Sequence, residues 1–122
     1  MIEYRDGISE RNIIPKDEYI IFRTRTKVDK DGKKLEGKLN PSSEIKMHMR
    51  VYKERPDVNA VVHAHPLYAT SFAIAGIPLT EPIMPEAVIA LGCVPIAEYG
   101  TPSTEEIPDA VSKYLQHYDA VL

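Results

Sequence analysis

The feature that most restricts the fold of this chain is a short apolar run, residues 59–65, with helical patterning on both sides of it. The run reads NAVVHAH and has the length of a strand. Residues 41–55 before it and 66–76 after it carry the signals of helix starts and stops. A strand between two helices predicts a domain of the α/β class.

The segment before the run predicts an amphipathic helix. Turn and capping residues at 40–43 (NPSS) stand ahead of EIKMHMRVYKER. Within that stretch, Ile45, Met49 and Tyr52 recur at helical spacing and form the expected buried stripe. The helix should end at Arg55, because a residue that precedes proline is disfavoured in the α region.

The segment after the run predicts a second, apolar helix. Pro66 suits the first turn of a helix, where a missing N–H has no cost, and LYATSFAIAG continues to Gly76, a residue typical of helix ends. The absence of a charged face predicts that this helix is buried.

The amino-terminal third predicts a β-hairpin. Residues 1–16 have weak patterning and are interpreted as a turn-rich lead-in, whereas residues 18–28 are rich in β-branched and aromatic residues and predict one strand. Asp31-Gly32 follows, and such a pair favours a tight turn in which both central residues have positive φ. Residues 33–38 should form the returning strand.

The carboxyl-terminal third predicts an irregular segment at 77–85, a short helix at 86–91 and a strand at 93–97. Ser103 and Glu106 have the spacing of a capping box, which predicts a last helix. Its buried stripe would comprise Ile107, Ala110, Val111, Tyr114 and Leu115. The final DAVL has the character of another strand.

Composition excludes several classes of protein. A chain of 122 residues fits a single domain, and a net charge of −3 argues against general nucleic-acid binding. No stretch has the roughly 20 apolar residues that span a bilayer. Cys93 stands alone, and the charged amino terminus has no signal-peptide core. These observations favour a cytoplasmic protein that does not bind membranes.

The pair His63-Ala-His65 is the strongest chemical signal. Histidines two residues apart on a strand project from one face, so both imidazoles could reach one tetrahedral metal ion. The alternative is a pair of packed histidines with hydrogen-bonded nitrogens. Zinc would need a further protein ligand, and spacing leaves several candidates open: Glu44, His48, Glu86, Cys93 and His117.

The second chemical signal is PSSE at residues 41–44. Ser42 and Ser43 at a helix start offer hydroxyls and backbone amides together, which suits a phosphate group. Glu44 at the same point could act as a base. The alternative is ordinary helix capping, with Glu44 favoured by the helix dipole.

Three blocks of sequence together resemble the class II aldolase family, which includes sugar-phosphate aldolases and 4-epimerases and shares its fold with the adducin head domain. The blocks are DGKKLEGKLNPSSE, HMRVYKERPDVNAVVHAHPLYATSFAIAG and PEAVIALGCVPIAEYGTPSTEE, followed by DAVL. They run from about residue 28 to residue 122, in the order and spacing of the family.

The resemblance implies a zinc-dependent aldolase that cleaves a phosphorylated ketose through an enediolate. His63 and His65 match two zinc ligands, and Glu44 matches the general acid/base, which can also approach the metal. Ser42 and Ser43 match serines that bind the substrate phosphate. The family also implies a three-layer α/β/α fold with a mostly antiparallel sheet, and a homotetramer.

The resemblance also has gaps. The third histidine of the family follows a strand like DAVL, beyond residue 122, and its upstream phosphate loop has no match in residues 1–12. The catalytic tyrosine of fuculose-phosphate aldolases has no counterpart in EPIMPEAV. The 122 residues are therefore expected to be one incomplete domain with weakened zinc binding. A 4-epimerase, a dehydratase and a non-catalytic adducin-like module are the alternatives.

Overall fold

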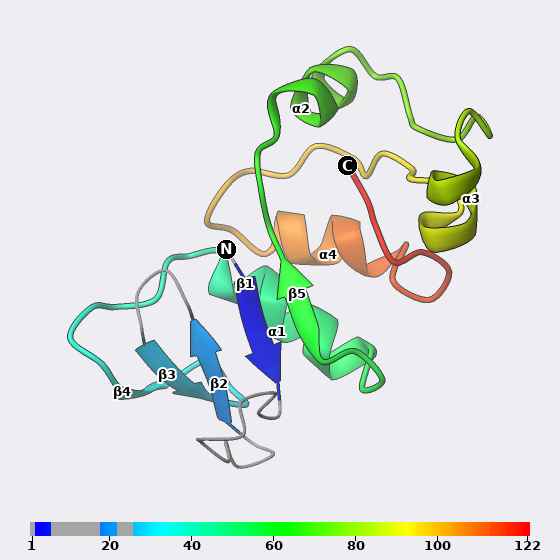
Figure 1. Ribbon diagram of the computed structural model, residues 1–122. Coiled ribbons are helices and arrows are strands. Elements are labelled where there is room, and N and C mark those ends of the chain that lie inside the picture. Colours follow the sequence, from blue (N-terminus) through cyan, green and yellow to red (C-terminus); the bar gives the residue numbers. More distant parts are fainter. Residues whose placement is uncertain (1, 6–17, 22–25) are drawn as a thin grey trace.

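The computed structural model of the chain describes residues 2–5, 18–21 and 26–122. The described strands form one sheet (Figure 1). Its order is β4-β3-β2-β1-β5, and each neighbouring pair is antiparallel. The strands are β1 (Ile2–Arg5), β2 (Glu18–Ile21), β3 (Thr26–Asp29), β4 (Lys34–Glu36) and β5 (Ala60–Val62). An antiparallel sheet with helices confirms the α/β class.

Strand β1 corrects the predicted turn-rich lead-in. It lies inside the sheet, where Tyr4 pairs with Ile20 of β2 on one side and with Ala60 of β5 on the other. A strand of four residues carries too little pattern to be recognised from its own side chains. Backbone pairing on both edges makes this segment a strand. The rest of the predicted lead-in, residues 6–16, lies outside the described residues.

The single strand predicted at residues 18–28 is also wrong. The structure has two strands, β2 and β3, which pair with each other so that Glu18 faces Asp29 and Ile21 faces Thr26. Two short antiparallel strands satisfy each other's backbone groups, which one long strand at this place would not do.

The hairpin between β3 and β4 is confirmed, with a different turn. Of the pair Asp31-Gly32, only Gly32 has a positive φ, of 77°. The Asp29 carboxylate accepts the backbone N–H groups of Asp31 and Lys33, both at 2.9 Å. A side chain therefore supplies turn contacts that the predicted tight turn would take from backbone alone.

Helix α1 (Ile45–Glu54) is confirmed and packs on the sheet. Tyr52 of α1 and Val28 of β3 form the buried centre, and full burial of such side chains contributes about 1.5–3 kcal/mol each. The partly buried residues around them are Ile45, Met49, Val58 and Val61. The same helix face also buries His48 completely.

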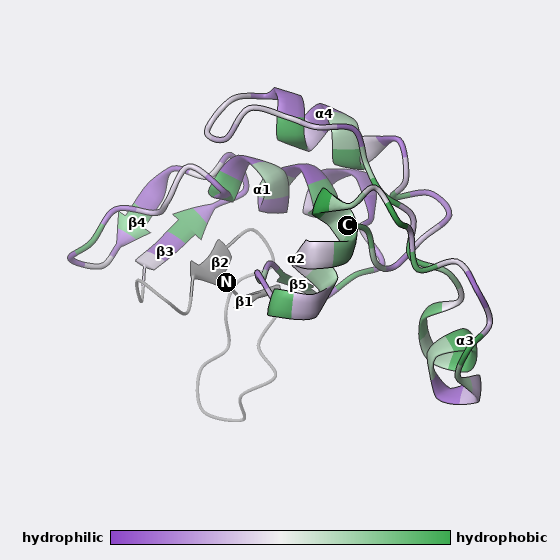
Figure 2. Ribbon diagram, turned by 90° about the horizontal axis from the view of Figure 1, so that it is seen from above, coloured by the Kyte–Doolittle hydropathy of each residue, from purple (hydrophilic) through white to green (hydrophobic). Residues whose placement is uncertain are grey.

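Helix α4 (Glu106–Ser112) packs against α1 from the side away from the sheet (Figure 2). Pro108 and Ala110 are its buried residues, and Leu115, which follows the helix, is buried as well. The Arg50 guanidinium pairs with the Asp109 carboxylate at 2.7 Å and ties the two helices together. The structure therefore layers α4 on α1 and α1 on the sheet.

The predicted capping box at the start of α4 is wrong. The Glu106 carboxylate accepts the backbone N–H of Thr101 at 2.8 Å, and the Thr104 hydroxyl accepts the N–H of Glu106 at 3.2 Å. Ser103 has a φ of 70° and directs its hydroxyl elsewhere. The N-cap residue is Glu105, whose side chain makes no capping hydrogen bond, and the contact with the Glu106 amide comes from Thr104 instead of Ser103.

Helix α2 (Leu67–Ile74) overturns the prediction of burial. Leu67, Tyr68 and Ile74 are 76–83% exposed, and no residue of α2 is buried. Pro66 is the residue before the helix instead of its first turn. Gly76 closes the helix as predicted, with a φ of 70°. The apolar pattern predicted a helix correctly but did not predict what covers it.

Helix α3 (Pro85–Leu91) confirms the predicted short helix, and Figure 1 shows that it lies far from the sheet. The predicted strand at residues 93–97 is wrong: only Val94 forms a bridge, with Leu79. The backbone N–H of Leu122 donates to the carbonyl of Pro95, and the N–H of Ala97 donates to the carbonyl of Leu122. Within DAVL, these bonds involve Leu122 alone. Pro95 has no N–H to extend a ladder.

None of the described helices has the length and hydropathy to cross a bilayer.

Candidate active site

Glu44 directly precedes α1 and has a carboxylate that does not cap the helix. Its backbone is helical, at φ −65° and ψ −13°, and its side chain makes no capping hydrogen bond. Carboxylate atom Oε2 instead lies 4.0 Å from Nδ1 of His63. The side chain keeps about a quarter of its surface exposed, at 24%. This carboxylate therefore faces a histidine and remains open to solvent.

His63 and His65 lie just after β5 and not on the strand as predicted, because β5 ends at Val62. Their rings nevertheless lie side by side, with centroids 4.8 Å apart and planes at 51°. His63 is half-buried, whereas His65 is exposed. The two imidazoles are brought together by an extended segment that ends at Pro66.

His48 of α1 lies behind this pair. It is fully buried, and its ring meets that of His63 edge-on, with centroids 6.3 Å apart. It follows Glu44 by one helical turn, so both residues belong to the helix face that looks toward the histidine pair. Of the further ligand candidates, Glu86 is on α3, Cys93 follows it, and His117 follows α4.

Glu44, His63 and His65 are of the residue types that bind metal ions. Two imidazoles and a carboxylate are ligand types that Zn²⁺ prefers. Within the described residues, however, no three His, Cys, Asp or Glu side chains are grouped closely enough to hold an ion. Glu44 and His63 approach each other, and His63 and His65 approach each other, without forming a closed three-ligand cluster.

The environment lowers the pKa of His63 and so favours its neutral form. Burial lowers the pKa of its imidazole, and the positive charges of His65 and His48 in their protonated forms act in the same direction. The Glu44 carboxylate opposes this shift. A neutral imidazole offers the lone pair that a metal ion requires.

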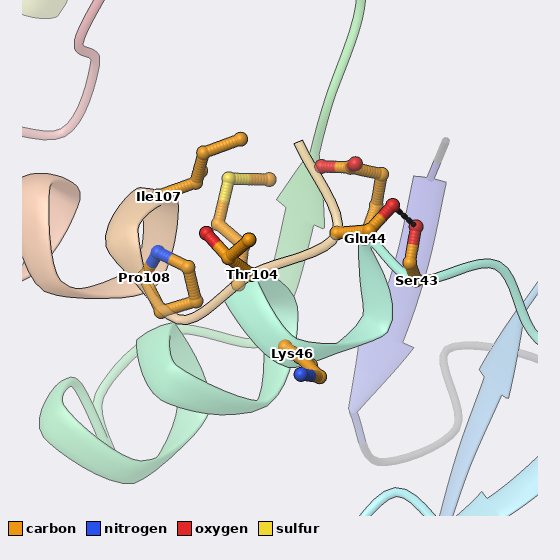
Figure 3. Close-up of a pocket in the computed structure, with 8 residues that line it drawn as sticks. Ser43, Glu44, Lys46, Thr104, Ile107 and Pro108 are labelled. Atoms are coloured by element: carbon orange, nitrogen blue, oxygen red, sulfur yellow. Dashed lines mark hydrogen bonds between the residues drawn. The ribbon is translucent and has the colours of Figure 1, made fainter. Parts of the chain in front are cut away.

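Ser42 and Ser43 are exposed at the start of α1, where their carbonyls accept the N–H groups of Ile45 and Lys46. The Ser43 hydroxyl is 2.7 Å from that of Ser103 (dashed in Figure 3). A shallow hollow lies here between α1 and the start of α4. Its lining comprises Ser43, Glu44, Lys46, Met47, Ser103, Thr104, Ile107 and Pro108.

Ser103 is a neighbour of the site that the sequence did not reveal. It stands sixty positions after Ser43, and nothing in the local pattern links the two. A capping Ser103 would turn its hydroxyl toward its own helix, not toward α1. Only the packing of α4 on α1 brings the hydroxyls together.

Comparisons with known proteins bear on the family and the fold of this chain. Residues 23–122 match the family model described as Class II Aldolase and Adducin N-terminal domain. The chain is 38% identical over 108 residues to an L-fuculose phosphate aldolase of Escherichia coli O6:H1, covering 87% of this chain and 46% of that one. It is 35% identical over 94 residues to a 5-deoxy-D-ribulose 1-phosphate aldolase of Bacillus thuringiensis serovar kurstaki, covering 75% and 43%.

A solved structure, of an L-fuculose 1-phosphate aldolase, has a similar fold. The TM-score is 0.77 at 28% sequence identity, and the superposition covers 99% of this chain and 59% of the other. The chain thus spans about half the length of the curated relatives that it matches.

Proposed function

Because this chain belongs to the class II aldolase and adducin family, we propose that it forms the catalytic part of a metal-dependent aldolase that cleaves a phosphorylated ketose. The observation that carries the proposal is the 4.0 Å approach of the Glu44 carboxylate to His63, whose ring lies beside that of His65. A base and two metal-binding groups are what such a reaction requires. Relatives named as aldolases of 1-phosphorylated ketoses support this class of substrate.

His63 and His65 would hold a zinc ion, with Glu44 near enough to approach it. Zinc, when bound, polarises the ketone and stabilises the negative charge of the enediolate. The lowered pKa of His63 supports ligation, since the imidazole is neutral at pH 7. The ring of His48 lies edge-on to that of His63, with centroids 6.3 Å apart.

Glu44 would move the proton. In the condensation direction its carboxylate removes a proton from the carbon beside the ketone, and the resulting enediolate attacks the aldehyde. The new alkoxide then takes a proton from water. In cleavage, water accepts the proton of the hydroxyl that becomes the aldehyde oxygen, the carbon–carbon bond breaks, and its electron pair passes to the enediolate. Glu44, in its protonated form, then gives its proton to the enediolate carbon and is again a carboxylate. Solvent exposure of 24% leaves the carboxylate accessible to substrate.

Ser42 and Ser43 would bind the substrate phosphate. Both hydroxyls are exposed at the start of α1, on the residues directly before Glu44. The positive end of the helix dipole favours an anion at this place. Binding there would hold the ketose beside the carboxylate.

We also propose that the protein is cytoplasmic and assembles as a homotetramer. The single cysteine supports a reducing compartment. The exposed apolar side chains of α2 and α3 support assembly, because large apolar surfaces are normally covered.

Metal analysis combined with an aldol assay tests the proposal. Zinc-loaded protein should retain metal after dialysis and release an aldehyde from L-fuculose 1-phosphate or a related ketose 1-phosphate. His63→Ala should lose both properties, while His117→Ala, a substitution of an exposed histidine after α4, should keep them. Wild-type protein that retains no zinc would favour the non-catalytic adducin-like alternative. Inversion of a hydroxyl-bearing carbon without cleavage would favour an epimerase.

A further inference from the structure

Resting on the proposed phosphate site, we propose that Ser103 is a positioning residue, whose hydroxyl orients that of Ser43 toward the substrate phosphate. The two oxygens are 2.7 Å apart, within the range of an O–H···O hydrogen bond. Ser103 reaches this place from the loop before α4, while Ser43 precedes α1. The loop thus completes a site that the start of α1 begins.

The number of hydrogens favours one direction for this bond. Either hydroxyl can donate to the other, and each carries one hydrogen. A phosphate dianion only accepts hydrogen bonds. If Ser103 donates to Ser43, the hydrogen of Ser43 is left for the phosphate, and the three groups form a chain in which each bond strengthens the next. Bound phosphate therefore selects the direction from Ser103 to Ser43.

The backbone of Ser103 supports a role beyond loop closure. Its φ of 70° lies in the left-handed region that non-glycine residues seldom adopt. Surrounding contacts hold this conformation: the Glu106 carboxylate accepts the N–H of Thr101, and the Thr104 hydroxyl donates to the carbonyl of Thr101 at 2.7 Å. Glycine would fit the backbone better, so the serine is explained by its hydroxyl.

Packing of α4 on α1 sets the distance between the two serines. The Lys46 ammonium pairs with the Glu105 carboxylate at 2.8 Å, close to the hollow, and Arg50 pairs with Asp109 one turn further along. Both ion pairs follow the Ser43–Ser103 contact, in the same direction, along the seam between the two helices. Ser103 therefore meets Ser43 at a position fixed by two helices.

Two substitutions separate orientation from a merely structural effect. Ser103→Gly removes the hydroxyl and relieves the backbone, so it should preserve or raise the urea midpoint yet weaken phosphate binding by about two- to tenfold, the effect of one hydrogen bond. Ser103→Thr keeps the hydroxyl on a residue less suited to positive φ, so it should lower the midpoint yet bind phosphate nearly as wild type.

Binding is measured by titrating the protein with inorganic phosphate and following the amide NMR signals of Ser43 and Glu44. Ser43→Ala tests the proposed site itself, and Ser71→Ala, which removes a hydroxyl that donates within α2, is the matched control. If Ser43→Ala loses binding but Ser103→Gly does not, the role of Ser103 is wrong and the phosphate site stands. If wild-type protein does not respond to phosphate, both proposals fall.

Discussion

At the scale of single residues, the proposed chemistry depends on the approach of the Glu44 carboxylate to the imidazole of His63. A glutamate at a helix start is usually explained by the helix dipole, and a histidine after a strand by packing. Here the glutamate makes no capping hydrogen bond and lies 4.0 Å from the histidine. Each side chain is placed by a different element, so their approach is a property of the fold.

Glu44→Gln tests the acid–base role. The amide keeps the shape of the side chain but cannot take up a proton, so we expect cleavage to slow by about 10²- to 10⁴-fold with zinc content preserved. Stopped assays of aldehyde release, with metal analysis of the same samples, measure both. Glu98→Gln is the control, because Glu98 is exposed, pairs with Lys113 and does not line the hollow. Unchanged turnover in Glu44→Gln would remove Glu44 from the reaction.

The pH dependence of stability tests the environment of His63. Its pKa in the folded protein lies below the ordinary value of about 6.5, so the unfolded chain binds more protons as the pH falls through 6.5. Stability should therefore decrease between pH 7 and pH 5.5. Urea unfolding at both pH values should show a smaller decrease for His63→Gln than for wild type. Equal decreases would mean that His63 is not held neutral.

Sequence predicted the residue types of the site but not all of its members. Glu44, His63 and His65 carry their own signals, in PSSE and HAH, and the structure brings them near one another. Their catalytic and metal roles stay predictions. Ser103 gave no such signal, because its contact with Ser43 depends on packing between segments far apart in the chain.

At the scale of elements, the loop before α4 is held very closely against the helix. A Cβ added at Gly100 would lie 2.8 Å from the backbone nitrogen of Ile107 and 2.9 Å from its Cγ1. Backbone atoms at that distance cannot move aside without shifting α4. The loop that presents Ser103 therefore needs a residue without a side chain at this point.

Gly100→Ala should destabilise the protein through this contact. Overpacking of this kind costs about 1–3 kcal/mol, measured as a lower free energy of unfolding in urea. Gly76→Ala is the comparison. The added Cβ has open space around it, so the expected cost of about 1–2 kcal/mol comes only from the positive φ. A smaller loss for Gly100→Ala than for Gly76→Ala would contradict the steric argument.

Elements whose pattern is local were predicted well, whereas elements defined by their partners were not. Helix α1, helix α3 and the β3–β4 hairpin follow from spacing, proline and glycine. Strand β1 and the division between β2 and β3 depend on pairing with other strands, which no local pattern records. The strand predicted at 93–97 does not form for the same reason. The segment has β propensity, but it makes a single bridge and contains a proline.

At the scale of the whole molecule, the apolar surface is unevenly distributed. The core lies between α1, α4 and the sheet, whereas α2 and α3 expose large apolar side chains. Ile74 is 83% exposed, Ile83 83% and Ile89 86%. Exposure of this extent is unusual for a monomer in water and is typical of surfaces that meet another polypeptide.

Ile74→Lys tests the proposed assembly. If α2 lies in a contact between copies, a buried ammonium there would be costly, and sedimentation velocity should show a smaller species than wild type. Leu35→Lys is the control, since Leu35 is 50% exposed on β4 at the other edge of the molecule. An unchanged sedimentation coefficient for Ile74→Lys would exclude α2 from the contact.

The seam between α1 and α4 also has a kinetic consequence. Ser43 meets Ser103, and Arg50 meets Asp109, across chain separations of 60 and 59 residues, so a long loop must close before these contacts form. The turn at Gly32 joins neighbours and can form early. In refolding followed by pulsed hydrogen exchange, amides of the β3–β4 hairpin should gain protection before those of α4; simultaneous protection would contradict this order. A nascent chain would therefore acquire its hairpin first and the contact between Ser43 and Ser103 last.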